Sequence, residues 1–171
     1  QAEQDLTETR YLTKQIIGAT YDNHFFDTRL KTSLFFKYYI QHVKLKDPLL
    51  VDKVLSYVEY DKTVENSGFG ATLSYRILPG FLLQASYEKA LRMPESNELL
   101  GNSSENITST YELKPEKSYN GNLGILLGPF DFGQHQFRGD VNMFIRDIRD
   151  MIIRGGIIDT KSDTYGFDNL G

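Results

Sequence analysis

Residues 69–92 read FGATLSYRILPGFLLQASYEKALR, and this stretch decides the fold. On both sides of Leu78-Pro79-Gly80, hydrophobic side chains alternate with small, polar or charged ones. An alternation of period two predicts a β-strand with one apolar and one polar face. Because proline fixes φ and glycine accepts positive φ, the three residues between the two strands predict a tight turn. The stretch is therefore a predicted β-hairpin.

A second hairpin is predicted nearer the N-terminus. Residues 32–40 alternate in the same way, with Phe35 and Tyr39 as two aromatic residues on the otherwise polar face. An earlier strand around residues 17–21 reaches them through a short connection at residues 23–27. This pair repeats the pattern of the first hairpin.

A third hairpin lies toward the C-terminus. Residues 119–127 and 137–145 alternate around a short turn at residues 128–133, and a further strand begins at Tyr165. The sequence therefore predicts about seven strands in an all-β, antiparallel, up-and-down meander.

Short and long connections between these strands alternate along the chain. Side-by-side hairpins with tight turns at one end and long loops at the other are typical of a transmembrane β-barrel. The apolar stretches 32–40, 69–77 and 137–145 also match the about 9 to 11 residues that a tilted strand needs to cross the hydrocarbon. The short turns are predicted at residues 23–27, 78–80 and 128–133, and the long connections at residues 43–68, 93–118 and 154–164.

Lys89 stands on the apolar face of its predicted strand, beside Tyr87. Counted from the turn at residues 78–80, it lies at the far end of the strand. A lysine there costs about 0 to 1 kcal/mol, against about 2 to 4 kcal/mol at mid-bilayer. We therefore expect Lys89 to lie at the outer membrane interface, where its ammonium group can reach water.

The overall composition excludes several classes of protein. Lysine and arginine number 19 against 23 acidic residues, and no basic run is present, so nucleic acid is not an expected partner. No apolar run is long enough for a transmembrane helix. The chain has no cysteine, which excludes disulfides, thiolate metal sites and a cysteine nucleophile. Its first residues lack a signal peptide, so we expect an internal or truncated piece of a longer gene product.

Catalytic, cofactor and metal motifs are not found in the sequence. The histidines His24, His42 and His135 are far apart, and no nucleophile elbow, zinc-protease helix or phosphate-binding glycine loop occurs. Acidic residues surround one C-terminal loop, but their spacing matches no calcium-binding loop. The sequence predicts no enzyme, no cofactor and no metal site. The acidic residues of that loop are Asp147, Asp150, Asp159 and Asp163.

A different class of protein fits the same alternation. In a soluble β-rich binding module, such as an adhesin or a carbohydrate-binding sandwich, strands also have one apolar and one polar face. The apolar faces would then pack on a second layer instead of meeting hydrocarbon. A third possibility, an outer-membrane hydrolase, would need a serine, a histidine and an acid clustered in the fold.

The segment after Arg92 carries the most specific local pattern. Residues 91–101 read LRMPESNELLG and residues 113–120 read LKPEKSYN. The pair resembles a signature of the barrels of TonB-dependent outer-membrane receptors, in which an Arg-x-Pro…Glu-Leu-x-Gly segment precedes Leu-Lys-Pro-Glu-x-Ser and a new strand. The resemblance extends through residues 85–92, 144–152 and 165–171, and it covers residues 65–171 well.

This resemblance implies a fold, a location and a set of partners. Such receptors are 22-stranded barrels in the outer membrane of Gram-negative bacteria, closed by a separate N-terminal plug. They take up a scarce nutrient, such as a siderophore, haem, a vitamin or a glycan. Residues 1–171 would form a partial β-barrel domain without the plug. The implied partners are the plug domain of the same receptor, the TonB energy-transducing complex acting through the plug, outer-membrane lipid and a small nutrient ligand.

The signature has two possible roles. In the structural one, Pro94 and Pro115 stiffen a loop that must leave and re-enter the barrel wall. In the functional one, four charged residues point inward and contact the plug or the ligand. Both readings remain open from the sequence. The four charged residues are Arg92, Glu98, Lys114 and Glu116.

Overall fold

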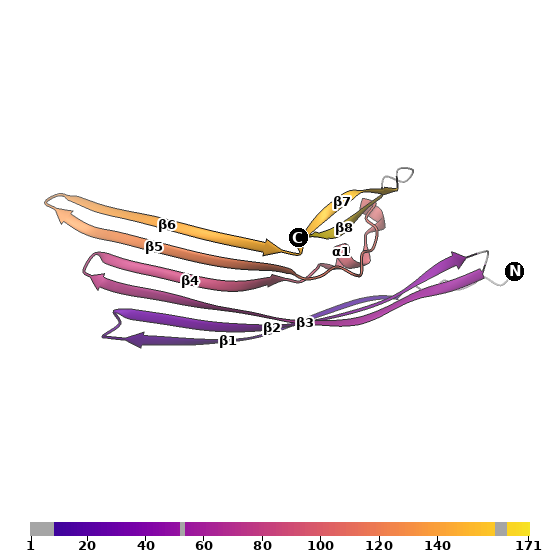
Figure 1. Ribbon diagram of the computed structural model, residues 1–171, viewed down its shortest axis with the longest axis horizontal. Coiled ribbons are helices and arrows are strands. Elements are labelled where there is room, and N and C mark those ends of the chain that lie inside the picture. The colour runs from indigo at the N-terminus through magenta and orange to yellow at the C-terminus, as the bar shows by residue number, and fades with distance from the viewer. Residues whose placement is uncertain (1–8, 52–53, 160–163) are drawn as a thin grey trace.

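A computed structural model of the protein describes residues 9–51, 54–159 and 164–171. Six strands form one antiparallel sheet in the order β1-β2-β3-β4-β5-β6, and β7 and β8 form a second, two-stranded sheet (Figure 1). The predicted antiparallel meander is confirmed, with eight strands in the described residues. The strands are β1 (Thr9–Phe25), β2 (Leu30–Val51), β3 (Val54–Leu78), β4 (Phe81–Arg92), β5 (Glu116–Phe132), β6 (His135–Arg149), β7 (Met151–Asp159) and β8 (Thr164–Leu170).

The turns β1–β2, β3–β4 and β5–β6 all lie at one end of the large sheet (Figure 1). Pro79 and Gly80, the latter with φ of 76°, form the turn between β3 and β4 as the sequence predicts. In the β1–β2 turn, the Arg29 amide donates to the Phe26 carbonyl over 3.0 Å. At the other end of the sheet lies the connection between β4 and β5, with helix α1 (Ser96–Leu100) and the 3₁₀-helix η1 (Ser103–Glu105).

The predicted long loop at residues 43–68 is wrong. β2 and β3 continue through it as a two-stranded ribbon, in register from Leu30↔Tyr75 to Val51↔Val54. Alternation continues in short pieces here, VKLK at residues 43–46 and VEYD at residues 58–61, but Asp47-Pro48 between them is a sequence typical of a turn. The backbone ladder needs no continuous alternation, because its hydrogen bonds join main-chain groups.

Two other predicted boundaries are also corrected. β5 does not turn at residue 128 but continues to Phe132, with a register shift between Leu127 and Phe130. Pro129 has no N–H to donate to the ladder, which accounts for an irregularity at this point. The connection predicted at residues 154–164 begins as strand, because β7 extends to Asp159 and pairs with β8. Residues 160–163 lie outside the described ranges.

The register gathers apolar side chains on one face of the large sheet. In one cross-strand row, Leu73 pairs with Ala85, Ala85 with Leu123, and Leu123 with Met143. We call the side that carries this row the apolar face, and the opposite side the polar face. Many hydrophobic residues of the apolar face are exposed, among them Leu73 at 38%, Met143 at 63% and Ile145 at 72%. Within the described ranges no second layer covers them, so they do not form the dry interior that a sandwich requires.

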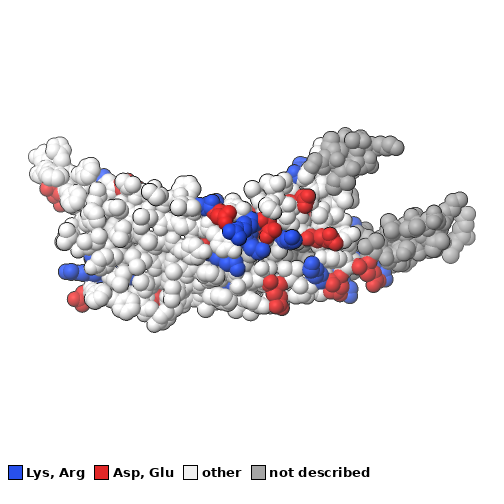
Figure 2. All heavy atoms as spheres, viewed as in Figure 1, with Lys and Arg blue, Asp and Glu red and all other residues white. Residues whose placement is uncertain are grey.

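Buried hydrophobic side chains lie instead beyond the apolar stretches, toward the long connections. Val43, Leu99, Leu113 and Ile152 form the cluster, joining β2, the β4–β5 connection and β7. On the face of the molecule in Figure 2, Lys, Arg, Asp and Glu gather toward this same end, and the sheet near the short turns carries few of them. Within the described residues, no helix has both the length and the apolar character needed to cross a bilayer.

Candidate functional site

The loop between β4 and β5, residues 93–115, folds onto the polar face of β1 and β2. Gln41 is 2% exposed, and its Nε2 donates to the Pro94 carbonyl over 2.8 Å. Arg10 of β1 donates from Nη1 to the Leu100 carbonyl over 2.8 Å. Leu12, the cross-strand partner of Val43, packs against the buried cluster. The β4–β5 loop therefore covers the polar face just beyond the apolar stretches of the strands.

Arg92 and Glu98 hold the start of this loop. The two terminal guanidinium nitrogens of Arg92 each donate to a different oxygen of Glu98, Nη1 to Oε2 over 3.2 Å and Nη2 to Oε1. The Glu95 amide at the start of α1 donates to Glu98 Oε2 over 2.7 Å. The Glu98 side chain is only 7% exposed and that of Arg92 is 43% exposed. A buried carboxylate with these three donors fixes how the chain leaves β4.

Gly101 ends helix α1 with φ of 73°. A Cβ atom at this position would lie 2.6 Å from the Ile107 carbonyl oxygen. Only glycine fits here, because both the backbone angle and the space exclude a side chain.

Glu116 and Lys114 mark the other end of the loop. Glu116 pairs with Arg92 across β4 and β5, and its Oε2 accepts a hydrogen bond from the Ile152 amide over 3.2 Å. The Lys114 side chain is exposed, while its main-chain N–H and C=O bind the amide of Asn169 over 2.8 and 3.0 Å. The structure thus brings Arg92, Glu98 and Glu116 around the base of the loop and leaves the Lys114 side chain in solvent.

Sequence reasoning missed Gln41 and Asn169, whose amides connect distant segments. Besides its bonds to Lys114, Asn169 donates from Nδ2 to the Asp150 carbonyl over 2.7 Å, joining the loop to the turn between β6 and β7. An amide that bonds main-chain groups leaves no recognisable pattern in a single sequence. In the sequence, Asn169 is marked only by its position in residues 165–171, which form part of the resemblance to the receptor barrels.

Lys14 stands opposite Gln41, on the part of β1 beyond the apolar stretch. Burial lowers the pKa of its ammonium group, against the opposing effect of Glu95 and Glu98. Lys14, whose side chain remains exposed, therefore adds a cation near the Arg92–Glu98 pair.

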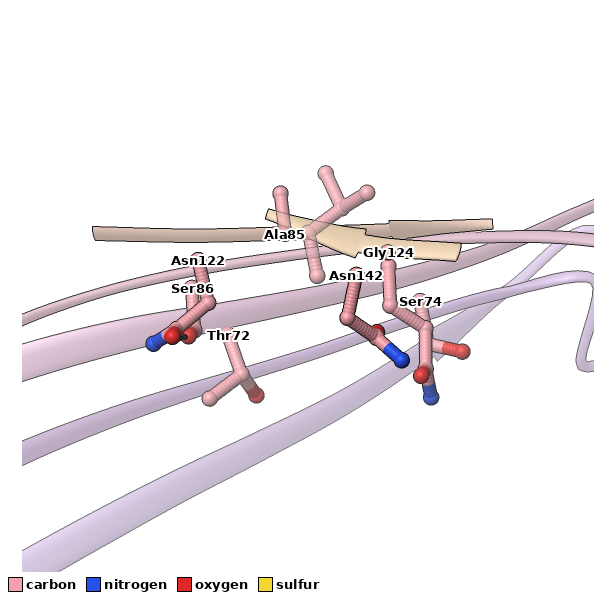
Figure 3. Close-up of a pocket in the computed structure, with 9 residues that line it drawn as sticks. Thr72, Ser74, Ala85, Ser86, Asn122, Gly124 and Asn142 are labelled. Atoms are coloured by element: carbon pink, nitrogen blue, oxygen red, sulfur yellow. Dashed lines mark hydrogen bonds between the residues drawn. The ribbon is translucent and has the colours of Figure 1, made fainter. Parts of the chain in front are cut away.

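Closer to the short turns, the polar face carries a shallow hollow of 280 Å³. In Figure 3, Thr72, Ser86, Asn122 and Asn142 project to one side of the sheet, and Ala85 projects to the other. Asn122 Nδ2 donates to Ser86 Oγ over 3.0 Å. These hydroxyl and amide groups can donate and accept hydrogen bonds, and none of them forms a nucleophile–base pair.

Phe35 and Tyr39, the aromatic residues of the polar face, lie over glycines of β3. A Cβ atom at Gly70 would overlap the Phe35 ring, and one at Gly68 would lie 3.5 Å from the Tyr39 ring. The Lys37 ammonium group lies 5.5 Å from the centroid of Phe35. Gly70 thus leaves room for the Phe35 ring, whereas at Gly68 the tight contact of an added Cβ atom would be with the Lys89 carbonyl oxygen, at 2.9 Å.

Ion pairs engage two of the acidic residues noted near the C-terminus. Asp147 accepts from Arg149 Nε over 3.0 Å, and Asp150 accepts from Lys117 Nζ over 3.0 Å. Asp163 lies outside the described residues. In the described part of the chain, no group of three or more His, Cys, Asp or Glu residues is placed to hold a metal ion.

Comparison with known proteins identifies a family and similar solved structures. Residues 13–171 match the family model described as TonB dependent receptor-like, beta-barrel. A solved structure of a double mutant of the Serratia marcescens hemophore receptor HasR, in complex with its hemophore HasA and heme, is similar with a TM-score of 0.66 and 16% identity. The match covers 95% of this chain and 30% of that chain, and at this identity it shows the fold alone. No curated protein matches the chain in sequence.

Proposed function

Because the chain belongs to the TonB-dependent receptor-like β-barrel family, we propose that it is part of the wall of a receptor that takes up a scarce nutrient across the bacterial outer membrane. The whole receptor binds and transports its ligand and is not an enzyme. The candidate ligands are a siderophore, haem, a vitamin or a glycan.

The exposure of the apolar face is the observation that carries this proposal. Val141 is 68% exposed and Ile145 is 72% exposed, and both lie on this face. Transfer of apolar surface out of water contributes about 25 cal/mol per Å². An apolar face that is exposed in this way is stable only against hydrocarbon or a partner protein. The interior of a bilayer provides the hydrocarbon.

The residues around the β4–β5 loop have two proposed roles. Glu98 and Glu116 hold the loop through the hydrogen bonds described above. Arg92 and Lys114, whose side chains are partly or largely exposed, contact the plug domain or the nutrient ligand at the mouth of the barrel. Their positive charge suits a ligand or plug surface with negative groups.

The remaining partners follow from the family. The plug domain of the same receptor packs against the polar face, whose hydroxyl and amide groups can exchange hydrogen bonds with it. The TonB complex acts on the barrel through that plug, and outer-membrane lipid surrounds the apolar face.

Growth rescue with the complete gene tests the proposal. In a strain lacking its own receptors for the four candidate nutrients, the complete protein should fractionate with the outer membrane and restore growth on at least one nutrient. Recovery of the complete protein in a soluble fraction, or growth on none of the four, would contradict it. Lys114→Ala that assembles normally but no longer supports uptake would place Lys114 in contact with plug or ligand, because its exposed side chain does not hold the loop.

A further inference from the structure

We propose that the apolar face holds one anionic lipid, with an acyl chain in a hollow between Ala71 and Ala85 and a phosphate headgroup at Lys89. This site rests on the proposed function, because it requires the apolar face to meet a bilayer. The proposed function requires only that lipid surrounds the barrel, whereas this site binds a lipid of negative charge at one position.

Two alanines create the hollow. Ala71 of β3 pairs with Tyr87 of β4, and Leu73 of β3 pairs with Ala85 of β4. With Leu34 of β2, these residues surround a depression of 330 Å³ on the apolar face. Large side chains stand beside small ones, and although Thr32, Thr72 and Ser86 also line the depression, most of its surface is apolar. A hydrocarbon chain fills such a space, whereas water finds too few hydrogen-bond partners there.

Lys89 lies in the next cross-strand row toward the long connections. It pairs with Phe69 of β3 and Tyr119 of β5, and its Nζ lies 5.9 Å from the centroid of the Phe69 ring. Tyr87 lies on the same face of β4, two positions from Lys89, and lines the hollow. A headgroup at Lys89 and a chain between Ala71 and Ala85 are thus one row apart, as a single lipid molecule requires.

The surroundings of Lys89 leave its charge available. No ion pair within the described residues involves Lys89. Asp147, the acidic member of the same row, is engaged by Arg149, whose guanidinium group lies 5.2 Å from the Tyr119 ring. Lysine and arginine over aromatic rings, next to an apolar surface, are suited to the charged headgroup layer of a membrane.

The combination favours an anionic lipid over other occupants. A free phosphate ion would use Lys89 but not the hollow. A zwitterionic lipid would use the hollow, but its own cation would compensate the phosphate charge. Only a lipid that combines an acyl chain with net negative charge satisfies both features.

Lipid retention by the complete receptor tests the proposal. The purified protein is delipidated in a non-ionic detergent and mixed with phosphatidylglycerol or phosphatidylcholine, and retained lipid is counted by native mass spectrometry. Wild type should prefer phosphatidylglycerol. Lys89→Gln should reduce that preference by about fivefold, the contribution of one interfacial lysine. Ala85→Leu, which fills the hollow, should lower retention of both lipids.

The matched control is Lys37→Gln, which removes the same charge from the polar face and should leave the preference unchanged. Equal preference for both lipids in wild type, or an unchanged preference in Lys89→Gln, overturns the lipid site. Displacement of the retained lipid by inorganic phosphate would also overturn it, because the site would then bind a free anion.

Growth rescue separates this proposal from the proposed function. If wild type and Lys89→Gln both support uptake but bind the two lipids alike, only the lipid site is wrong. If the complete protein fractionates as a soluble protein, the proposed function fails first.

Discussion

Replacing Arg92 by methionine should loosen the β4–β5 loop. The substitution keeps an apolar stem but removes the two donors to Glu98, whose side chain is 7% exposed. A fully buried charge that loses its partner costs about 3 to 5 kcal/mol. Because the Arg92 side chain is 43% exposed, water partly replaces the guanidinium group. We therefore expect Arg92→Met to lower the free energy of opening the β4–β5 loop by about 2 kcal/mol. This cost is within the range of a hydrogen bond to a charged group.

Hydrogen exchange in the complete receptor measures this opening. The amides of Leu99 and Gly101 donate within the loop, to the carbonyls of Glu95 and Asn97. A cost of about 2 kcal/mol corresponds to about 30-fold faster exchange if the loop opens locally. Adding Glu98→Gln to Arg92→Met should restore part of the protection, because the uncompensated charge is then gone.

Arg146→Met is the matched control. Arg146 donates from Nε to Asn120 Oδ1 over 2.9 Å on an exposed part of β5 and β6, and none of its described bonds reaches the loop. Exchange in residues 93–115 should stay at the wild-type rate in this variant. Equal exchange rates in Arg92→Met and Arg146→Met would refute the reasoning that the Arg92–Glu98 pair holds the loop.

Three further substitutions test the packing and the two faces. Asn169→Leu, which removes the bonds joining the loop to the β6–β7 turn, should lower the free energy of unfolding by about 2 kcal/mol, measured by denaturant titration; a change below about 0.5 kcal/mol would contradict this role. Gly70→Ala should destabilise the sheet by about 1 to 3 kcal/mol because its Cβ overlaps an aromatic ring, whereas Gly121→Ala, with open space around it, should be tolerated in the same titration. Val141→Lys, in the middle of the apolar stretch 137–145, should cost about 2 to 4 kcal/mol in folding into lipid vesicles, and Asn142→Lys on the polar face much less; equal costs would argue against a hydrocarbon-facing apolar face.

The hairpins could be predicted from sequence because alternation and turn chemistry are local. Residues 69–92 contain both strands and their Pro79-Gly80 turn, and the structure has β3, the turn and β4 at these positions. The register also places Lys89 opposite Phe69 and Tyr119, toward the long-connection end of β4, where it was expected.

The extended ribbon of β2 and β3 could not be predicted in this way. Its strands continue past the apolar stretches, where alternation persists at residues 43–46 and 58–61 but Asp47-Pro48 has the sequence of a turn. Lys46 and Glu59 form an ion pair of 3.2 Å across this ribbon. Such a pair supports the ladder, but a single sequence does not show which charged residues lie opposite one another.

The candidate site was predicted only in part for a related reason. Arg92 and Glu98 are six positions apart, and the sequence pattern drew attention to both. The direction in which the loop folds depends on Gln41, which is 53 positions from its partner Pro94. A contact of that separation follows from the register of the whole sheet, and no local pattern encodes it.

Spin labels along β6 test most directly which solvent each face meets. The chain itself has no cysteine, so once any cysteine elsewhere in the receptor is replaced, single cysteines at Val141, Met143 and Ile145 on the apolar face, and at Asp140, Asn142 and Phe144 on the polar face, can each carry one label. In the complete receptor reconstituted in lipid vesicles, the first set should be accessible to oxygen, which partitions into hydrocarbon. The second set should be shielded from it. Loss of this alternation, or high accessibility of the first set to a water-soluble nickel chelate, would contradict the account.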